Sequence, residues 1–350
     1  MIRKLLLLLE GSVVLAGLLL GVAAWQQHEA LHQPLNLSAE HVIEVPAGAT
    51  PGGVLNRLQA DGIIDKAFWL RQYWRFNLSG QPLHSGEYQL KPGQTVSDML
   101  NMWQRGDVLQ YSITLVEGWN FRQVRSALAR EQRLEQTLSG VSDNELMNKL
   151  GLAGQHPEGR FFPDTYSFVR GTSDLDLLKK ANARLEKVLA EEWEKRDDDL
   201  PYKEPYDALI MASMIERETG VAQERGEIAG VFVRRLRMGM RLQTDPTVIY
   251  GMGERYNGRI TRADLREPTP YNTYTIDGMP PTPIALAGRE AIRAALKPVA
   301  GKSLYFVARG DGSHVFSETL EQHNRAVREY QLKRRADYRS SPAPVTAPQQ

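Results

Sequence analysis

The stretch YDALIMASMIERETG, from Tyr206 to Gly220, combines a continuous apolar, helix-forming run with two carboxylates near its end. Successive residues of an α-helix advance by about 100°, so Glu216 and Glu218 point roughly 200° apart and cannot both face one cleft. We therefore expect only one of them to work in a site. On a helical wheel the two acids have different neighbours: Glu218 lies with Met211, Met214 and Ile215, and Glu216 lies with Leu209, Ala212 and Ser213.

Glu218 is the better candidate for a catalytic acid because its company is more apolar. Apolar neighbours disfavour the charged form of a carboxyl group and raise its pKa. A general acid that works at neutral pH requires such a raised pKa. The alternative is a structural ion pair between Glu218 and Arg217, Arg225 or another arginine.

The composition is that of a globular protein with room for two or three domains. Of the 350 residues, 42% are hydrophobic, which is enough to bury a substantial core. The 43 Lys and Arg residues balance 42 Asp and Glu residues, and a formal charge of +1 gives no basic field that would favour nucleic acid. The chain has no cysteine, which excludes disulfides, thiolate zinc sites and cysteine nucleophiles.

An apolar segment near the N-terminus predicts a membrane anchor. Arg3 and Lys4 precede a run from Leu5 to Trp25 that would extend about 31 Å as a helix, enough for a bilayer core. Positive charge on its N-terminal side predicts a cytoplasmic start and a large remainder across the membrane. A cleavable signal peptide ending near Val22–Ala24 is the alternative, but the apolar run is longer than is usual for one.

Residues His28 to His32, HEALH, match the H-E-x-x-H pattern of zinc proteases. Pro34 soon interrupts any helix there, and no second helix is evident to supply a third ligand. We therefore predict neither a zinc site nor any other bound metal or cofactor.

Three units between Ile43 and Leu128 share one pattern around a glycine. Each glycine follows a short apolar stretch and precedes, by two positions, a residue of the helix N-cap type. The pattern predicts a strand, a glycine turn and a capped helix, three times. The glycines are Gly48, Gly93 and Gly118, and the caps are Thr50, Thr95 and Asn120. The first two units resemble the glycan-binding LysM module, although a purely structural role suits such common units equally.

The remaining chain predicts helices, a hairpin and polar loops. Amphipathic patterns with start and stop signals mark three further helices, and a strand pair is joined by the turn Gly310–Ser313. The helices cover residues 174–196, 224–237 and 287–296, and the strands 303–308 and 314–316. The loops Tyr271–Thr275 and Gly278–Ile284 carry aromatic, amide and polar groups that suit contacts to sugars. Turn chemistry alone would explain many of the same residues.

Four long motifs in one order carry a family resemblance. They are EGRFFPDTY from Glu158, MASMIERET from Met211, RLQTDPTVIYGMG from Arg241 and YNTYTIDGMPPTPI from Tyr271. Through them the chain resembles the YceG-like endolytic murein transglycosylases, from the anchor to about Lys333. The resemblance implies that Glu218, the second glutamate of the E-x-E-T motif, is the catalytic residue. It also implies a glycan cleft lined by Gln243, Asp245, Tyr271, Asn272, Tyr274, Glu158 and Tyr166.

Together, the patterns and the resemblance predict an α+β fold. It comprises a single N-terminal transmembrane helix, a small LysM-like α/β module and a mixed α+β catalytic domain with a lysozyme-like helical active site. The expected ranges are 1–4 for the cytoplasmic start, 5–25 for the transmembrane helix, 26–42 for a linker, 43–112 for the LysM-like domain, 113–335 for the catalytic domain and 336–350 for a tail rich in Pro, Ala and Ser, expected to be disordered.

The resemblance further implies a location and a reaction. The chain would be anchored in the bacterial inner membrane, with its catalytic domain on the periplasmic side beside peptidoglycan synthases. It would cleave the β-1,4 bond between N-acetylmuramic acid and N-acetylglucosamine of nascent strands without water, leaving 1,6-anhydromuramoyl ends that terminate strand elongation. Hydrolases employ two carboxylates, whereas one acid suffices when the C6 hydroxyl of the substrate is the nucleophile.

Two alternative functions remain open at this point. One is a non-catalytic peptidoglycan-binding scaffold that recruits synthases, with Glu218 held in an ion pair. The other is an ordinary muramidase, which adds water and leaves reducing muramic ends. Analysis of the products on peptidoglycan separates all three.

Overall fold

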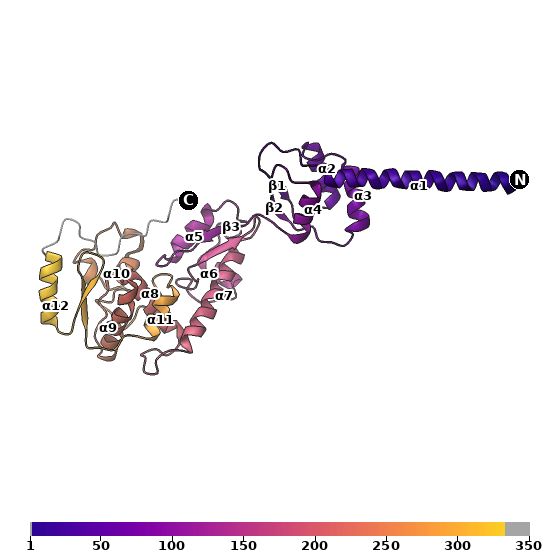
Figure 1. The fold of residues 1–350 in the computed structure, drawn as a ribbon. Coiled ribbons are helices and arrows are strands. Elements are labelled where there is room, and N and C mark those ends of the chain that lie inside the picture. Colours follow the sequence, from indigo (N-terminus) through magenta and orange to yellow (C-terminus); the bar gives the residue numbers. More distant parts are fainter. Residues whose placement is uncertain (1, 333–350) are drawn as a thin grey trace. The chain divides into compact units, whose positions relative to one another are not determined.

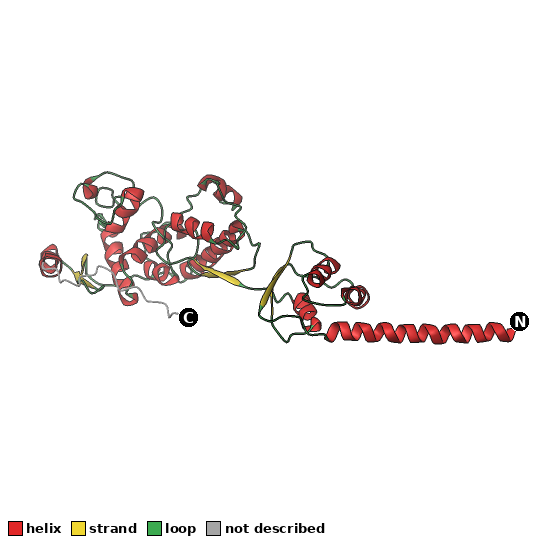
Figure 2. Ribbon diagram, turned by 90° about the horizontal axis from the view of Figure 1, so that it is seen from above, coloured by secondary structure: helices red, strands yellow, loops and turns green. Residues whose placement is uncertain are grey.

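The computed structural model describes residues 2–332, with side chains from residue 10 onward. The predicted tail 336–350 and the end of the predicted catalytic range therefore lie outside the described residues. Contacts divide the described residues into two compact units: residues 2–111 with 167–172, and residues 112–166 with 173–332. Helices predominate and the strands pair two by two, as β1 with β2, β3 with β4, and β5 with β6 (Figures 1 and 2). The predicted α+β class is confirmed.

The first unit packs helices against one small antiparallel sheet. Strand β1 pairs with β2 so that Ile43 lies opposite Tyr88, and the largest side chains in this core include Tyr88 and Trp103, both fully buried. Its elements are α1 (Ile2–His32), β1 (His41–Val45), α2 (Pro51–Ala60), α3 (Ala67–Asn77), β2 (Gly86–Leu90) and α4 (Val96–Arg105).

Helix α1 extends beyond both ends of the predicted 5–25 span. Among the residues that the structure describes, no helix combines the length and apolarity needed to cross a bilayer. The side chains of residues 5–9, which belong to the predicted anchor, lie outside the described set. Within the predicted linker, residues 26–32 continue α1, and Ala30 and Leu35 are buried in the core of the first unit.

The HEALH segment is part of the last turns of α1. Glu29 forms an ion pair with Lys66, and a ring nitrogen of His32 lies 2.8 Å from the carbonyl oxygen of His28. These contacts are structural. Between residues 2 and 332, the structure shows no group of three His, Asp or Glu side chains placed to hold a metal ion.

The predicted strand, glycine turn and capped helix are confirmed in all three units. Gly48, Gly93 and Gly118 have φ angles of 76°, 86° and 78°, a left-handed conformation that glycine adopts without strain. Thr50 and Thr95 cap α2 and α4, and Asn120 caps α5 (Phe121–Arg130) through a capping box with Gln123. Helix α5, from the third copy of the glycine pattern, belongs to the second of the two compact units. The site described below lies in that compact unit.

The second unit is built around α8 (Pro205–Glu218). The eight residues Ala208–Ile215 are all buried, and α8 contacts α7, α9, α10 and α11 (Figure 1). A helix that is apolar on every side is expected at the centre of a domain rather than on its surface. The surrounding helices are α6 (Asp143–Lys149), α7 (Asp174–Trp193), α9 (Arg225–Arg237), α10 (Asp245–Met252), α11 (Arg289–Leu296) and α12 (Leu320–Val327).

Short elements complete the second unit. The predicted hairpin is present, with β5 (Tyr305–Ala308) antiparallel to β6 (His314–Ser317) and Val307 opposite Val315. Strands β3 (Tyr111–Thr114) and β4 (Thr165–Phe168) pair with each other, and the division between the units falls within both strands. Single turns of 3₁₀ helix cover Ala222–Glu224, Gly253–Arg255 and Asp264–Arg266, and a π-helical turn covers Arg328–Leu332.

Candidate active site

Glu218 is the last residue of the central helix α8. The helix ends there because Thr219 is extended, with φ −140° and ψ 138°. The carboxyl group is thus carried by an element that is packed on all sides. A rigid support of this kind holds a reacting group in one geometry.

The surroundings of Glu218 raise the pKa of its carboxyl group to about 7, chiefly because the group is withdrawn from water. The negative charge of Asp245 acts in the same direction. The hydroxyl group of Thr244 donates a hydrogen bond to Oε1 of Glu218, which lowers the pKa in part. The raised pKa predicted for Glu218 is confirmed.

The neighbouring acid Glu216 has different partners, as the helical geometry predicts. It accepts a hydrogen bond of 3.0 Å from the backbone of Gly288, and its Oε1 lies 3.5 Å from the guanidinium group of Arg225. Burial also raises the pKa of Glu216, because α8 is surrounded by protein on every side. Apolar company alone therefore does not separate the two acids; their partners do.

The ion-pair alternative for Glu218 is not the arrangement observed. Arg225 pairs with Glu216, and Arg217 donates a hydrogen bond of 3.1 Å to the carbonyl oxygen of Gly118. Within residues 2–332 the structure shows no ion pair of Glu218. Its carboxyl group is bound by a neutral hydroxyl, which leaves it able to carry a proton at neutral pH.

Two loops predicted to bind glycan meet beside Glu218. The backbone of Gln243, which has a φ of 53°, donates to the carbonyl oxygen of Thr273, and the backbone of Thr244 donates to the Thr273 hydroxyl. The phenol of Tyr274 donates a 2.6 Å hydrogen bond to Oδ1 of Asp245. The structure thus brings Gln243, Asp245 and Tyr274 together with Glu218.

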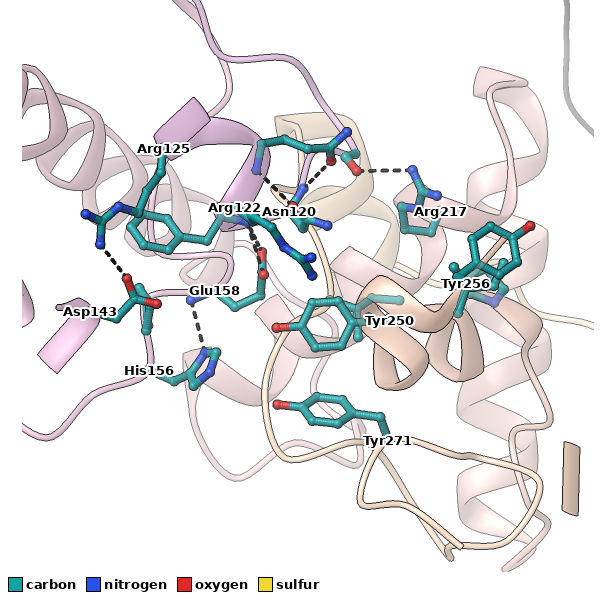
Figure 3. Close-up of a pocket in the computed structure, with 18 residues that line it drawn as sticks. Asn120, Arg122, Arg125, Asp143, His156, Glu158, Arg217, Tyr250, Tyr256 and Tyr271 are labelled. Atoms are coloured by element: carbon teal, nitrogen blue, oxygen red, sulfur yellow. Dashed lines mark hydrogen bonds and ion pairs between the residues drawn. The ribbon is translucent and has the colours of Figure 1, made fainter. Parts of the chain in front are cut away.

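The second unit contains a cavity of about 660 Å³ (Figure 3), and Glu218, Gln243, Asp245 and Tyr274 are not among the residues that line it. Arg217 and Pro246 line it, and these residues adjoin Glu218 and Asp245 in the chain. Aromatic rings provide much of its wall, as suits the stacking of sugars: Phe121, Tyr250, Tyr256 and Tyr271.

Glu158 lines the same cavity but also has a structural role. Both of its carboxylate oxygens accept from the backbone of Phe121, at 3.0 and 3.1 Å, at the start of α5. Burial raises the pKa of Glu158 to about 7, although the hydrogen bonds from Phe121 and Tyr250 lower this pKa in part. In Figure 3 the Glu158 carboxyl group points toward the start of α5, the Tyr250 phenol lies beside it and Tyr271 lies beyond Tyr250.

Two residues of the predicted cleft bind carbonyl oxygens of their own segments. The side chain of Asn272 is buried, and its amide donates to the carbonyl oxygens of Asp264, Leu265 and Glu267, which closes a turn. The phenol of Tyr166 donates to the carbonyl oxygen of Phe162 at 2.7 Å. Neither side chain lines the cavity, which is also true of Gln243, Asp245 and Tyr274, and contact of Asn272 and Tyr166 with glycan stays a prediction.

Sequence reasoning missed Thr244, Arg217 and Arg122 as site residues. Thr244 was available as a signal, because it stands between two predicted ligands, Gln243 and Asp245. Arg217 offered a similar signal, because it lies between Glu216 and Glu218 in the chain, whereas Arg122 offered none. Their place beside the cavity depends on how α5 and α8 are arranged in space.

Replacing Thr244 by valine tests the hydrogen bond to Glu218. The bond stabilises the ionised carboxylate, so its loss should raise the pKa of Glu218 further and move the alkaline limb of the pH–activity profile to higher pH. The measurement is kcat/KM against pH. Thr247→Val is the matched control, because the Thr247 hydroxyl contacts the Thr244 carbonyl and Thr273 but not Glu218. An equal displacement in both variants would contradict this role of Thr244.

A helix-borne acid with a pKa near 7, in the same unit as an aromatic cavity, is the kind of site used by enzymes that cleave polysaccharides. The model of the YceG-like family matches residues 43–329, and the chain belongs to this family.

Two similar proteins have the same name, and a similar crystal structure is of a YceG-like protein. The chain is 32% identical over 312 residues to a protein of Bacillus subtilis (strain 168) named endolytic murein transglycosylase, covering 82% of this chain and 84% of that protein. A protein of the same name from Streptococcus pneumoniae (serotype 2, strain D39) is 24% identical over 324 residues, which cover 82% of this chain and 58% of that protein. A crystal structure of a YceG-like protein from Listeria monocytogenes matches with a TM-score of 0.54 and 29% identity, over 83% of this chain and 99% of that one.

Proposed function

We propose that this chain is an endolytic murein lytic transglycosylase. It cleaves the β-1,4 bond between N-acetylmuramic acid and N-acetylglucosamine inside peptidoglycan strands. The observation that carries the proposal is the carboxyl group of Glu218: it ends a buried helix, has a pKa of about 7 and is bound by a hydroxyl rather than by an arginine. Relatives named endolytic murein transglycosylase support the same assignment.

The proposed reaction requires one acid that changes its role. Glu218 first donates its proton to the glycosidic oxygen, and the bond from this oxygen to C1 of the muramoyl residue breaks. The Glu218 carboxylate then takes the proton of the muramoyl C6 hydroxyl, whose oxygen bonds to C1 and closes the 1,6-anhydro ring. The proton gained equals the proton lost, and no water is added. The nucleophile is held within the substrate, which replaces a second carboxylate.

The cluster around Glu218 suits this cycle. The Asp245 charge favours the protonated form before cleavage, and the Thr244 hydroxyl stabilises the carboxylate after it. The tyrosine rings of the cavity would hold the sugars, with Tyr271 fixed by Thr282 at 2.9 Å and by the ring of Tyr250 at 4.8 Å. Gln243 and Tyr274, on the two loops that meet beside Glu218, would also contact the glycan.

Product analysis tests the proposal against its alternatives. The purified chain is incubated with peptidoglycan, and the soluble and strand-end products are examined by mass spectrometry. Cleavage at internal positions of the strands is expected, and each cut should leave an anhydromuramoyl end. Reducing muramic ends, heavier by one water, would identify a muramidase. Intact strands that retain the bound protein would identify a scaffold.

We propose that residues 5–25 anchor the chain in the bacterial inner membrane, with the rest on the periplasmic side. Arg3 and Lys4, the apolar run to Trp25 and the unbroken helix α1 support this topology. Alkaline phosphatase fused after residue 332 should be active and should sediment with inner membranes. A soluble periplasmic product that begins near Gln26 would instead show a cleaved signal peptide.

We also propose that the first unit contains a LysM-like glycan-binding module. The order β1, α2, α3, β2, with the two strands antiparallel, supports it. Hydrogen exchange of the Glu218→Gln chain with added peptidoglycan should show protection in residues 41–90. Unchanged exchange there would contradict glycan binding by this module. Association with peptidoglycan synthases is proposed from the reaction on nascent strands, and failure of any synthase to co-purify with the membrane-bound chain after crosslinking would count against it.

A further inference from the structure

The cavity of the second unit has a cationic side that the cleavage of the glycan does not use. Arg122, from the first turn of α5, and Arg217, from the last turn of α8, both line it. In Figure 3 the guanidinium group of Arg122 extends into the middle of the view, between Glu158 and Arg217. Two helices that lie 95 positions apart in the chain thus direct positive charge to one cavity.

The current partners of these two arginines are weak competitors for a ligand. Arg122 lies 2.9 Å from Glu254, whose side chain is 85% exposed, and the Arg122 side chain is itself 55% exposed. Exposed ion pairs of this kind contribute only about 0–1 kcal/mol. Arg217 uses one nitrogen for the carbonyl oxygen of Gly118 and is otherwise exposed. Both guanidinium groups therefore retain donors for an incoming anion.

The third arginine of the cavity has a different role. Arg125 donates to Asp143 at 2.7 Å and to the carbonyl oxygens of Leu138 and Val141. Its side chain is only 27% exposed. It fixes the loop before α6, and its bond to Asp143 offsets the negative charge of that acid within the cavity.

The chemistry of a peptidoglycan strand identifies the anion. In an intact strand the lactyl carboxyl group of each muramoyl residue is bound as an amide to its stem peptide, so the glycan itself offers no charge for two arginines to neutralise. The anionic groups of the strand are the carboxylates of the peptide stems, which are attached to the muramoyl residues. Planar guanidinium groups bind carboxylates with paired hydrogen bonds.

We propose that Arg122, together with Arg217, forms a subsite for a stem-peptide carboxylate of the strand that is being cleaved. The inference rests on the proposed function and adds a substrate preference to it: strands that bear acidic stems are cleaved in preference to strands whose stems are neutral. In the free protein Arg122 is paired with Glu254, and the carboxylate of the substrate replaces Glu254 as its partner.

The test compares three substrates. They are uncrosslinked strands with free-acid stem peptides, the same strands with the stem carboxylates amidated, and strands from which an amidase has removed the stems. The muramoyl residues of the third substrate carry a free lactyl carboxylate, so it compares a carboxylate on the sugar with one on the peptide. The quantity measured is the ratio of kcat/KM for free-acid strands to that for amidated strands, from the formation of anhydromuramoyl ends. Because amidation keeps the bulk of the peptide, this ratio reports the charge alone.

The expected ratio is about tenfold for the unaltered chain, in line with a charge-assisted hydrogen bond. Arg122→Gln should bring it close to one, and Arg122→Lys should restore part of it. Arg130→Gln is the matched control, because Arg130 is exposed on the same helix and does not line the cavity. Glu254→Gln should leave the ratio at least as high as in the unaltered chain. Arg122 is varied rather than Arg217 because the charge of Arg217 also lowers the pKa of Glu218.

The outcomes separate this inference from the function on which it rests. A ratio near one in the unaltered chain, or a ratio that Arg122→Gln does not change, would overturn the subsite while cleavage itself remained. A fall in rate that is equal for all three substrates would show a structural role of Arg122 and would also overturn it. No anhydromuramoyl ends from any substrate would instead refute the proposed function.

Discussion

Glu218→Gln should reduce the formation of anhydromuramoyl ends by about 10²–10⁴-fold, the contribution that general acid–base catalysis commonly makes. Glutamine keeps the size of the side chain and still accepts the hydrogen bond from Thr244, but it has no proton to give to the glycosidic oxygen. Both halves of the proposed cycle are lost together. Binding of the strand should persist, so the variant is expected to remain on peptidoglycan.

The matched control is Glu186→Gln, the same change at an exposed position of α7. It should keep full activity, and circular dichroism should show both variants folded. Because Glu218 must be protonated to act and its pKa is about 7, kcat/KM of the unaltered chain should fall as the pH rises above about 7. Cleavage by Glu218→Gln at the rate of the control would remove Glu218 from the mechanism.

Gly159→Ala should destabilise the second unit by about 3 kcal/mol. Gly159 has a φ of 73°, and a Cβ atom there would lie 2.4 Å from Cβ of Pro283. The left-handed backbone costs an alanine about 1–2 kcal/mol, and the overlap adds about 1–3 kcal/mol because the stiff proline ring cannot move aside easily. Glu158 precedes this glycine, so its carboxylate, which accepts from the Phe121 backbone at the start of α5, should also be displaced. Activity should fall as a result. Urea unfolding measures the loss.

Gly154→Ala is the control that isolates the overlap. Gly154 has a φ of 77°, almost the same as Gly159, but nothing lies within 4 Å of its added Cβ. The free energy of unfolding of this variant should fall by only the backbone contribution of about 1–2 kcal/mol. Equal losses in the two variants would show that the close approach of Gly159 to Pro283 does not matter for stability.

Local signals in the sequence predicted the elements well. The caps Thr50, Thr95 and Asn120 begin helices where the glycine pattern places them. Predicted helix ends differ by up to a few residues: α7 ends at Trp193 rather than Arg196, and α11 begins at Arg289 rather than Ala287. Caps and glycine turns involve residues only two to four positions apart, so they are legible without a tertiary structure.

The candidate site was predicted in part. Glu218, Asp245 and Tyr274 lie together, and Glu158 and Tyr271 line one cavity. Asn272 and Tyr166 belong to the same motifs and bind carbonyl oxygens of their own segments. A motif identifies a segment, whereas the direction of each side chain within it depends on the neighbours that the segment meets.

By itself, the sequence determined most of the helical segments, although not α3, α6 or α12. It also determined where the predicted caps and glycine turns lie, to which family the chain belongs and that Glu216 and Glu218 point apart. Only the tertiary structure decided that Thr244 binds Glu218 across 26 positions, that Arg225 pairs with Glu216, and that Arg122 and Arg217 share a cavity. The physical reason is the distance along the chain over which each effect acts. Helix geometry and capping act within one or two turns, but the pKa and the partners of a buried carboxyl group depend on every segment that displaces water around it.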